Sequence, residues 1–168
     1  MRRIIISLTL FLTCCMSFCQ SNDLLARSAF TLKLPIDKTH FFQAEISPSN
    51  YILPVNTIQI YPGEKLYIEI NVKKSRIVDM KSVREIKDST KTIEISLTHV
   101  DKDSIYSRTM LDIQNPFKND LIYKATMYLM KYNKWGPTNV YPVRSNLRSI
   151  EIWSDVIVTM ALTGWEFK

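Results

Sequence analysis

The chain of 168 residues is poor in the residue types that mark many enzyme and metal sites. It has three glycines, two histidines and three cysteines, and the cysteines are Cys14, Cys15 and Cys19. So few glycines exclude a glycine-rich phosphate loop or a glycine-punctuated β-helix. Because no cysteine follows Cys19, the rest of the chain can hold neither a disulfide nor a thiolate metal site. We expect no cofactor.

Catalytic motifs are also missing. No Gly-x-Ser-x-Gly elbow of a serine hydrolase occurs. His40 follows Asp37, and His99 precedes Asp101 and Asp103, and a carboxylate that orients an imidazole can bind metal or move protons. Both groups lie in polar segments typical of turns. We therefore expect no metal site and no enzyme, with an unrecognised hydrolase as the alternative.

The net charge of +6 comes from basic residues that are scattered along the chain. The one close cluster is Lys73, Lys74 and Arg76. A nucleic-acid-binding protein is expected to carry a basic stripe with interleaved aromatic residues, and none is visible. We expect no nucleic-acid partner and interpret the cluster as the solvated end of a strand, where lysine discourages sheet-to-sheet pairing.

The start of the chain has the order of a secretory signal. Arg2 and Arg3 precede a mostly apolar run from Ile4 to Cys15, and polar residues return at Gln20. This pattern predicts a signal peptide over residues 1–19 and an exported protein of the periplasm or outer cell envelope. An uncleaved anchor or a buried N-terminal helix is the alternative.

Cys19 is a candidate for lipidation, which would give the protein its only membrane attachment. The bacterial lipid attachment box has a small residue before the modified cysteine, and Phe18 departs from that pattern. Whether the signal is cut before Cys19, with lipidation, or after it stays open.

Residues 24–168 are expected to form one domain of short strands. The segment Lys65 to Val72 alternates apolar and polar side chains, as do Thr92 to Val100 and Ile105 to Ile113. A period of two is typical of half-buried antiparallel strands. About eight or nine such strands at regular spacing predict an all-β fold, an antiparallel β-sandwich that is Ig-like in general architecture. A closed barrel is the alternative.

Four segments depart from this alternation. Tyr61-Pro62-Gly63-Glu64 predicts a type II turn, and Trp135-Gly136-Pro137 a second turn. Leu121 to Tyr132 is apolar on both faces, which is typical of a central strand or of one beside a partner. Arg76 to Asp88 has apolar residues at helical spacing and is interpreted as mixed.

Aromatic residues are dense after residue 120, and two of them, Trp135 and Tyr141, are expected on loops. Aromatic side chains dominate binding hot spots and stack on sugars. The candidate binding residues are Tyr132, Trp135, Tyr141 and Arg144.

The sequence favours a non-catalytic interaction module that binds another exported or envelope protein as an accessory or assembly component. The alternatives are a carbohydrate-binding module that uses the loop aromatics, and a carrier of hydrophobic ligands built on a closed barrel.

Overall fold

The computed structural model describes residues 25–103 and 105–168. The predicted signal peptide, its cut site and the lipidation candidate Cys19 lie outside the described residues. None of the helical segments within them is long and apolar enough to span a lipid bilayer.

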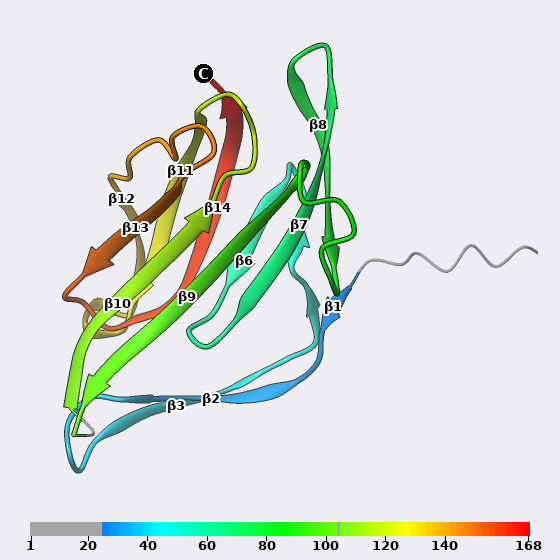
Figure 1. Cartoon of the computed structure of the whole chain (residues 1–168). Coiled ribbons are helices and arrows are strands. Elements are labelled where there is room, and N and C mark those ends of the chain that lie inside the picture. Colours follow the sequence, from blue (N-terminus) through cyan, green and yellow to red (C-terminus); the bar gives the residue numbers. More distant parts are fainter. Residues whose placement is uncertain (1–24, 104) are drawn as a thin grey trace, which may run out of the picture.

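The chain forms two five-stranded antiparallel sheets packed face to face, which confirms the predicted β-sandwich (Figure 1). In spatial order, the front sheet holds β13 (Arg148–Trp153), β10 (Ile105–Gln114), β9 (Thr92–Lys102), β7 (Lys65–Lys73) and β8 (Arg76–Val83). The back sheet holds β12 (Lys134–Thr138), β11 (Leu121–Leu129), β14 (Ile157–Phe167), β6 (Thr57–Ile60) and β5 (Ile52–Leu53). Each sheet keeps two free edges, so the fold is an open sandwich and not a closed barrel.

Strand alternation builds the interior. In β7, Leu66, Ile68 and Ile70 are buried while the residues between them are partly exposed, as the period of two predicts. Equivalent residues of both sheets meet in one continuous apolar cluster that fills the space between the layers. Its fully buried large members are Ile58, Ile60, Ile68, Ile70, Ile93, Ile95, Leu97, Leu111, Ile113, Leu121, Ile157 and Met160.

A hairpin of β2 (Phe30–Pro35) and β3 (Phe41–Ile46) crosses one end of the sandwich (Figure 1). Leu32 and Leu34 are buried with Val158 of β14 in a second, smaller cluster. At the tip, the Ile36 carbonyl accepts a hydrogen bond from Tyr106 N at 3.3 Å, at the start of β10. The hairpin therefore contacts both sheets.

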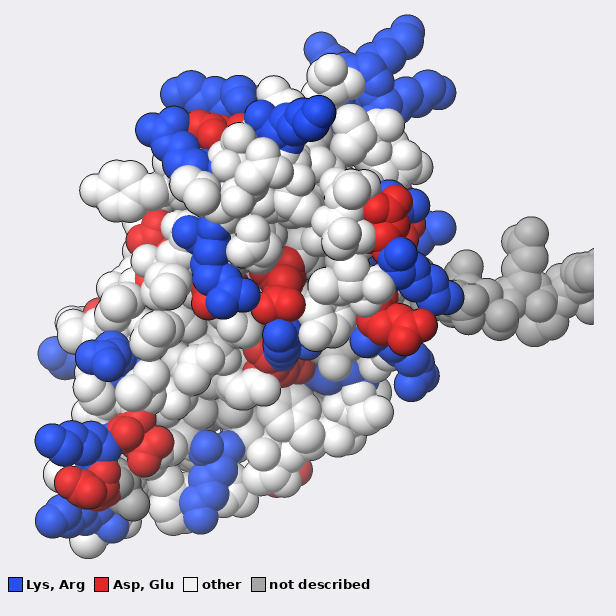
Figure 2. All heavy atoms as spheres, viewed as in Figure 1, with Lys and Arg blue, Asp and Glu red and all other residues white. Residues whose placement is uncertain are grey.

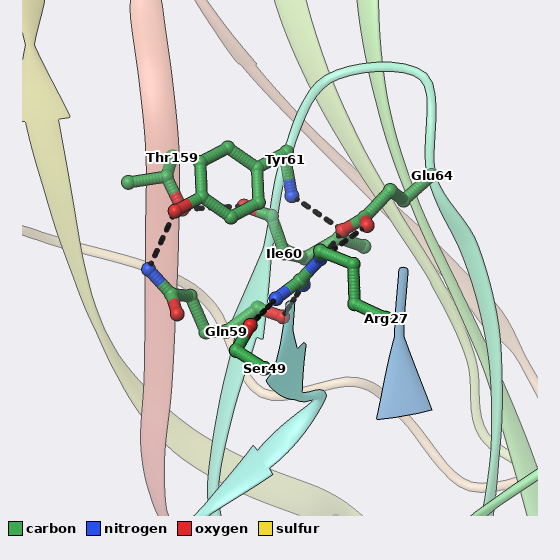
Figure 3. A network of polar contacts seen from close by, with 7 residues as sticks. All are labelled: Arg27, Ser49, Gln59, Ile60, Tyr61, Glu64 and Thr159. Atoms are coloured by element: carbon green, nitrogen blue, oxygen red, sulfur yellow. Dashed lines mark hydrogen bonds and ion pairs between the residues drawn. The ribbon is translucent and has the colours of Figure 1, made fainter. Parts of the chain in front are cut away.

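The short strands β1 (Ala26–Arg27) and β4 (Ser49–Asn50) pair beside a buried ion pair (Figure 3). Arg27 has a side chain only 2% exposed and binds Glu64 through two hydrogen bonds, Nε to Oε1 at 2.6 Å and Nη2 to Oε2 at 2.9 Å. The guanidinium also lies over the rings of Tyr51 and Tyr61, 4.6 and 4.8 Å from their centroids. We call these four residues the Arg27 clamp.

The clamp uses the predicted turn at Tyr61-Pro62-Gly63-Glu64. Gly63 has a φ of 92°, which a type II turn requires and which glycine adopts without strain. Glu64 N donates to the Tyr61 carbonyl at 3.1 Å, and Glu64 Oε2 accepts from Tyr61 N at 2.8 Å. The turn thus presents its own carboxylate to Arg27.

Two segments differ from the sequence-based predictions. Of Arg76 to Asp88, interpreted as mixed, Arg76–Val83 is strand β8, because pairing with β7 outweighs a helical spacing of apolar residues, and the rest belongs to the connection to β9. Trp135-Gly136-Pro137, predicted as a turn, lies within β12, and the reversal occurs earlier, at Met130–Tyr132 and Asn133. Pro137 is tolerated there because β12 is an edge strand. The strands exceed the predicted number because β1, β4 and β5 are too short for alternation to show, and because β8 and β12 were not predicted as strands.

We expect the Arg27 clamp to behave as a buried ion pair whose two halves cannot be removed separately. Glu64→Leu should lower the free energy of unfolding by about 3–5 kcal/mol, because it leaves a desolvated guanidinium without its carboxylate. The double variant Arg27→Met/Glu64→Leu should lose less free energy of unfolding than the single variant Glu64→Leu. Urea unfolding of both variants measures the difference.

Arg148→Ala is the control, since its ion pairs with Glu94 and Asp112 are half-exposed and should contribute less than about 1 kcal/mol. Equal losses for Glu64→Leu and Arg148→Ala would contradict the buried ion pair.

Candidate binding surface

The turn that joins β11 to β12 carries two of the predicted aromatic residues. Leu129 leads into a 3₁₀ turn, η1 (Met130–Tyr132), and Asn133 closes it with a φ of 49°, a left-handed conformation that asparagine tolerates well. Tyr132 is 52% exposed and Trp135, at the start of β12, is 47% exposed. Tyr132 and Trp135, three residues apart along the chain, are thus both exposed where β11 turns into β12, and we call this part of the sandwich the aromatic end.

Tyr128 of β11 holds the aromatic end in place. Tyr128 of β11 contacts the Trp135 ring edge to face, with centroids 5.6 Å apart and an interplanar angle of 73°. The Tyr128 hydroxyl donates to Asn133 Oδ1 at 2.6 Å. These contacts fix both the turn and the indole, so little side-chain entropy would be lost when Trp135 meets a partner.

Two lysines give the aromatic end a positive charge. Lys131 Nζ lies 5.2 Å, and Lys134 Nζ 5.8 Å, from the centroid of the Tyr132 ring. Both distances fall within cation–π range. The exposed face of Tyr132 is thus flanked by cations from either side of the turn.

Tyr141 and Arg144 lie on the segment that connects β12 to β13. Tyr141 is 77% exposed, and its backbone N donates to Glu151 Oε1 at 2.7 Å. Arg144 Nη1 binds Asp120 Oδ2 at 2.6 Å. A backbone hydrogen bond from Ser145, together with Arg144, holds the pKa of Asp120 below its ordinary value.

The four predicted residues do not form one site. Trp135 pairs with Tyr128 near the end of β11, whereas Val143, next to Arg144, pairs with Leu121 at its beginning. The length of β11 separates these points by roughly 25 Å at the usual rise of an extended chain. Only Tyr132 and Trp135 are neighbours, and Arg144 is occupied by its ion pair.

A second exposed apolar area lies on β13, where sequence reasoning placed no site. Ile150 is 50% and Ile152 57% exposed on the outer face of the front sheet, and Ile152 lies beside Met110 of β10. Much of the surface over β13 and β10 carries no charge (Figure 2). Hydrophobic alternation alone would turn the isoleucines inward and Ser149 and Glu151 outward, whereas the structure packs Trp153 on the interior and so exposes the isoleucines.

Asn115 is another residue that sequence reasoning missed. It is fully buried, and Nδ2 donates to the carbonyls of Asn119, Val143 and Arg144 at 2.9, 2.9 and 3.1 Å. Its Oδ1 accepts from Phe117 N at 2.9 Å. A single amide therefore ties the segment that carries Tyr141 and Arg144 to the end of β10.

The Asp37 and His40 pair forms part of the β2–β3 turn. His40 Nδ1 lies 2.8 Å from Asp37 Oδ2, and both side chains are well exposed. Asp37 Oδ1 also accepts from the backbone N of Thr39 and of His40, each at 2.8 Å. The Thr39 hydrogen bond, and then His40, hold the pKa of Asp37 well below its usual range. The Asp37 carboxylate thus stabilises the β2–β3 turn through these hydrogen bonds.

His99 lies near the C-terminal end of β9 and stacks on Tyr106, with ring centroids 4.4 Å apart. Among the described residues, neither imidazole nitrogen has a hydrogen-bond partner. Burial lowers the pKa of His99 below its ordinary 6.5, and the Asp101 carboxylate partly opposes that shift. The arrangement favours the neutral imidazole.

Two further observations concern ligand sites. Within residues 25–103 and 105–168, no three His, Asp or Glu side chains gather where they could hold a metal ion. An open hollow of about 690 Å³ lies between β1, β2 and the Tyr61–Glu64 turn. Two of the charged groups along it, Arg27 and Glu64, are already paired with each other.

We expect Asn115→Ala to destabilise the protein by about 2–3 kcal/mol, because three carbonyls and the Phe117 N–H would lose their partner. Asn139→Ala, at an exposed position of the same connecting segment, should change stability by less than about 0.5 kcal/mol. Urea unfolding measures both, and similar values for the two variants would contradict the anchoring role of Asn115.

His99 should make stability depend on pH in a defined direction. A base whose pKa is lower in the folded state is protonated first in the unfolded state, so stability falls as the pH drops below about 6.5, the unfolded value. His99→Phe keeps an aromatic ring against Tyr106 and cannot titrate. Its urea midpoint should show a weaker decline between neutral and acidic pH than the unmodified protein, and an unchanged decline would refute this assignment.

No family model, curated protein or solved structure matches the chain. Its function must therefore be argued from the surfaces described above.

Proposed function

We propose that the protein is an exported, non-catalytic interaction module that binds another envelope or surface protein through the aromatic end. The single observation that supports this is the pair Tyr132 and Trp135, both about half exposed on one firmly held turn. Tyrosine and tryptophan are enriched in interface hot spots because each buries a large area for few rotatable bonds.

The flanking lysines indicate the character of the partner. Lys131 and Lys134 surround the Tyr132 ring, so a partner surface that offers apolar contact together with carboxylates would complement the aromatic end. Such a surface is typical of a folded protein. The basic start and apolar run of residues 1–19 support export to the periplasm or outer envelope, and Cys19 supports an alternative, lipid-anchored form.

A carbohydrate platform is less well supported. Sugar-binding platforms present aromatic rings that a sugar face can stack on, and the Trp135 ring stands edge to face on Tyr128 at 73°. Tyr141 lies on a different segment, the one that Asn115 anchors. The carrier hypothesis also loses support, because the apolar cluster fills the space between the sheets.

Photo-crosslinking in the exporting cell tests the proposal. p-Benzoylphenylalanine in place of Trp135 should yield a covalent adduct with one other protein. The same group in place of Phe41, which is similarly exposed on β3, should yield little or none. The double variant Tyr132→Ala/Trp135→Ala, with an unchanged urea midpoint, should bind the identified protein at least about 30-fold more weakly.

Equal adducts at both positions, or none at either, would count against the proposed surface. Retention of the purified protein on envelope polysaccharide, abolished by the same double variant, would instead support the carbohydrate alternative.

A further inference from the structure

Among the four edges of the two five-stranded sheets, β13 is the one with the least protection. β12 contains Gly136 and Pro137, and β5 is two residues long. β8 carries exposed Arg76 and Lys81, and its buried Ser82 donates to the Leu25 carbonyl at 2.7 Å. β13 has six residues, no proline, glycine or lysine, and an uninterrupted register with β10. Proline, lysine and short length are among the devices by which proteins blunt open edges, and β13 has none of these; its one inward-pointing charge is Glu151.

The backbone of β13 directs alternate hydrogen-bonding groups away from the sheet. Asn115 N donates to the Leu147 carbonyl at 2.9 Å, in register with the β10–β13 ladder. Because antiparallel pairing alternates, Ser149, Glu151 and Trp153 face β10 with their N–H and C=O groups. The N–H and C=O groups of Arg148, Ile150 and Ile152 therefore point outward along the free edge, where only another strand can pair with all of them.

The side chains beside this edge suit a second strand. Ile150 and Ile152 leave apolar surface exposed on the outer face. Arg148 forms ion pairs within its own sheet, from Nη2 to Glu94 Oε1 and from Nε to Asp112 Oδ1, each at 3.2 Å. A chain that is positively charged overall thus presents little repulsion at β13.

We propose that β13 pairs antiparallel with β13 of a second copy of this chain, about a two-fold axis that passes through Ile150. In this register Ile150 faces Ile150 of the second copy, and Arg148 faces Ile152. On the inner face Glu151 opposes Ser149, so no like charges meet. Placing the axis at Glu151 would bring two carboxylates together, which disfavours that register.

Self-pairing suits β13 because it matches this edge with an identical one and brings no like charges together. Pairing of β13 with another edge of the five-stranded sheets would meet proline, a short strand or the exposed Arg76 and Lys81 of β8. An isologous β13 contact uses the β13 edge of both copies, so it closes as a dimer and the same contact cannot propagate into a fibre. The two front sheets join into one continuous sheet. The surface lies on a different element from the aromatic end, so this inference does not rest on the proposed function.

Disulfide trapping in the exporting cell tests both pairing and register. Ile150→Cys places two Cα atoms about 5.5 Å apart across the axis, within disulfide range, and should give a covalent dimer. Ile152→Cys is the matched control, since its two copies would lie more than about 13 Å apart along the strands and should remain unlinked. The unmodified chain measures any background from Cys14, Cys15 and Cys19.

Sedimentation of the purified exported chain gives an independent readout. Pairing of two edge strands buries a small surface area, so we expect a dissociation constant of roughly 1–100 μM. Ile150→Lys should weaken dimerisation at least about tenfold, because two ammonium groups would face each other at the axis. Val78→Lys, at an exposed position on β8, should leave it unchanged.

Three results would overturn the inference: a monomer well above 100 μM, stronger linking by Ile152→Cys than by Ile150→Cys, or an Ile150→Cys adduct with a different protein in place of a dimer.

Discussion

The buried contact between Arg27 and Glu64 is the constraint on which much of the arrangement depends. The guanidinium donates to the Glu64 carboxylate, to Ser49 Oγ and to the Gln59 carbonyl (Figure 3). It also lies over the rings of Tyr51 and Tyr61. A charge with this little exposure is stable only when its partners are all in place. The buried guanidinium therefore requires β1, the turn Tyr61–Glu64 and, through Ser49, β4 to assemble together, although β1 is distant from the other two in sequence.

Tyr61 extends this constraint to the hairpin. Its ring lies under Arg27 and meets Phe30 edge to face, with centroids 5.7 Å apart. Phe30 begins β2 and packs against the small cluster of Leu32, Leu34 and Val158. The position of the hairpin across the end of the sandwich is thus coupled to the ion pair through one aromatic side chain. Because Val156 and Met130 also pack on that cluster, the hairpin lies close to the base of the aromatic end.

The fold was largely predictable from the sequence, since alternation alone determines which face of β7, β9 and β10 is buried. The turn at Pro62-Gly63 was predictable for a similar reason, because few other residue pairs fit its dihedral angles. The Arg27 clamp was not predictable, because Arg27, Ser49 and Glu64 meet only after folding. Local patterns also failed at Trp135, where Gly136-Pro137 has the composition of a turn but lies on an edge strand.

The binding surfaces were less accessible to sequence reasoning. The exposure of Tyr132 and Trp135 agrees with their selection as candidates, but the grouping with Arg144 was wrong in space, because β11 holds the two ends apart. The isoleucines of β13 resembled core residues, because Ile150 and Ile152 alternate with the polar Ser149 and Glu151. The structure shows that both isoleucines meet solvent, and the order of strands in the front sheet shows that β13 is an edge. An edge position depends on topology, which alternation does not encode.

The hairpin of β2 and β3 has a consequence for how the molecule fluctuates. Its apolar contacts belong to a cluster separate from the main interior, and its backbone hydrogen bonds are made mostly within itself. An element attached in this way can detach while both five-stranded sheets remain intact. Its amide hydrogens are then expected to exchange with solvent sooner than those of β7 or β9, which gives this small protein two levels of cooperativity.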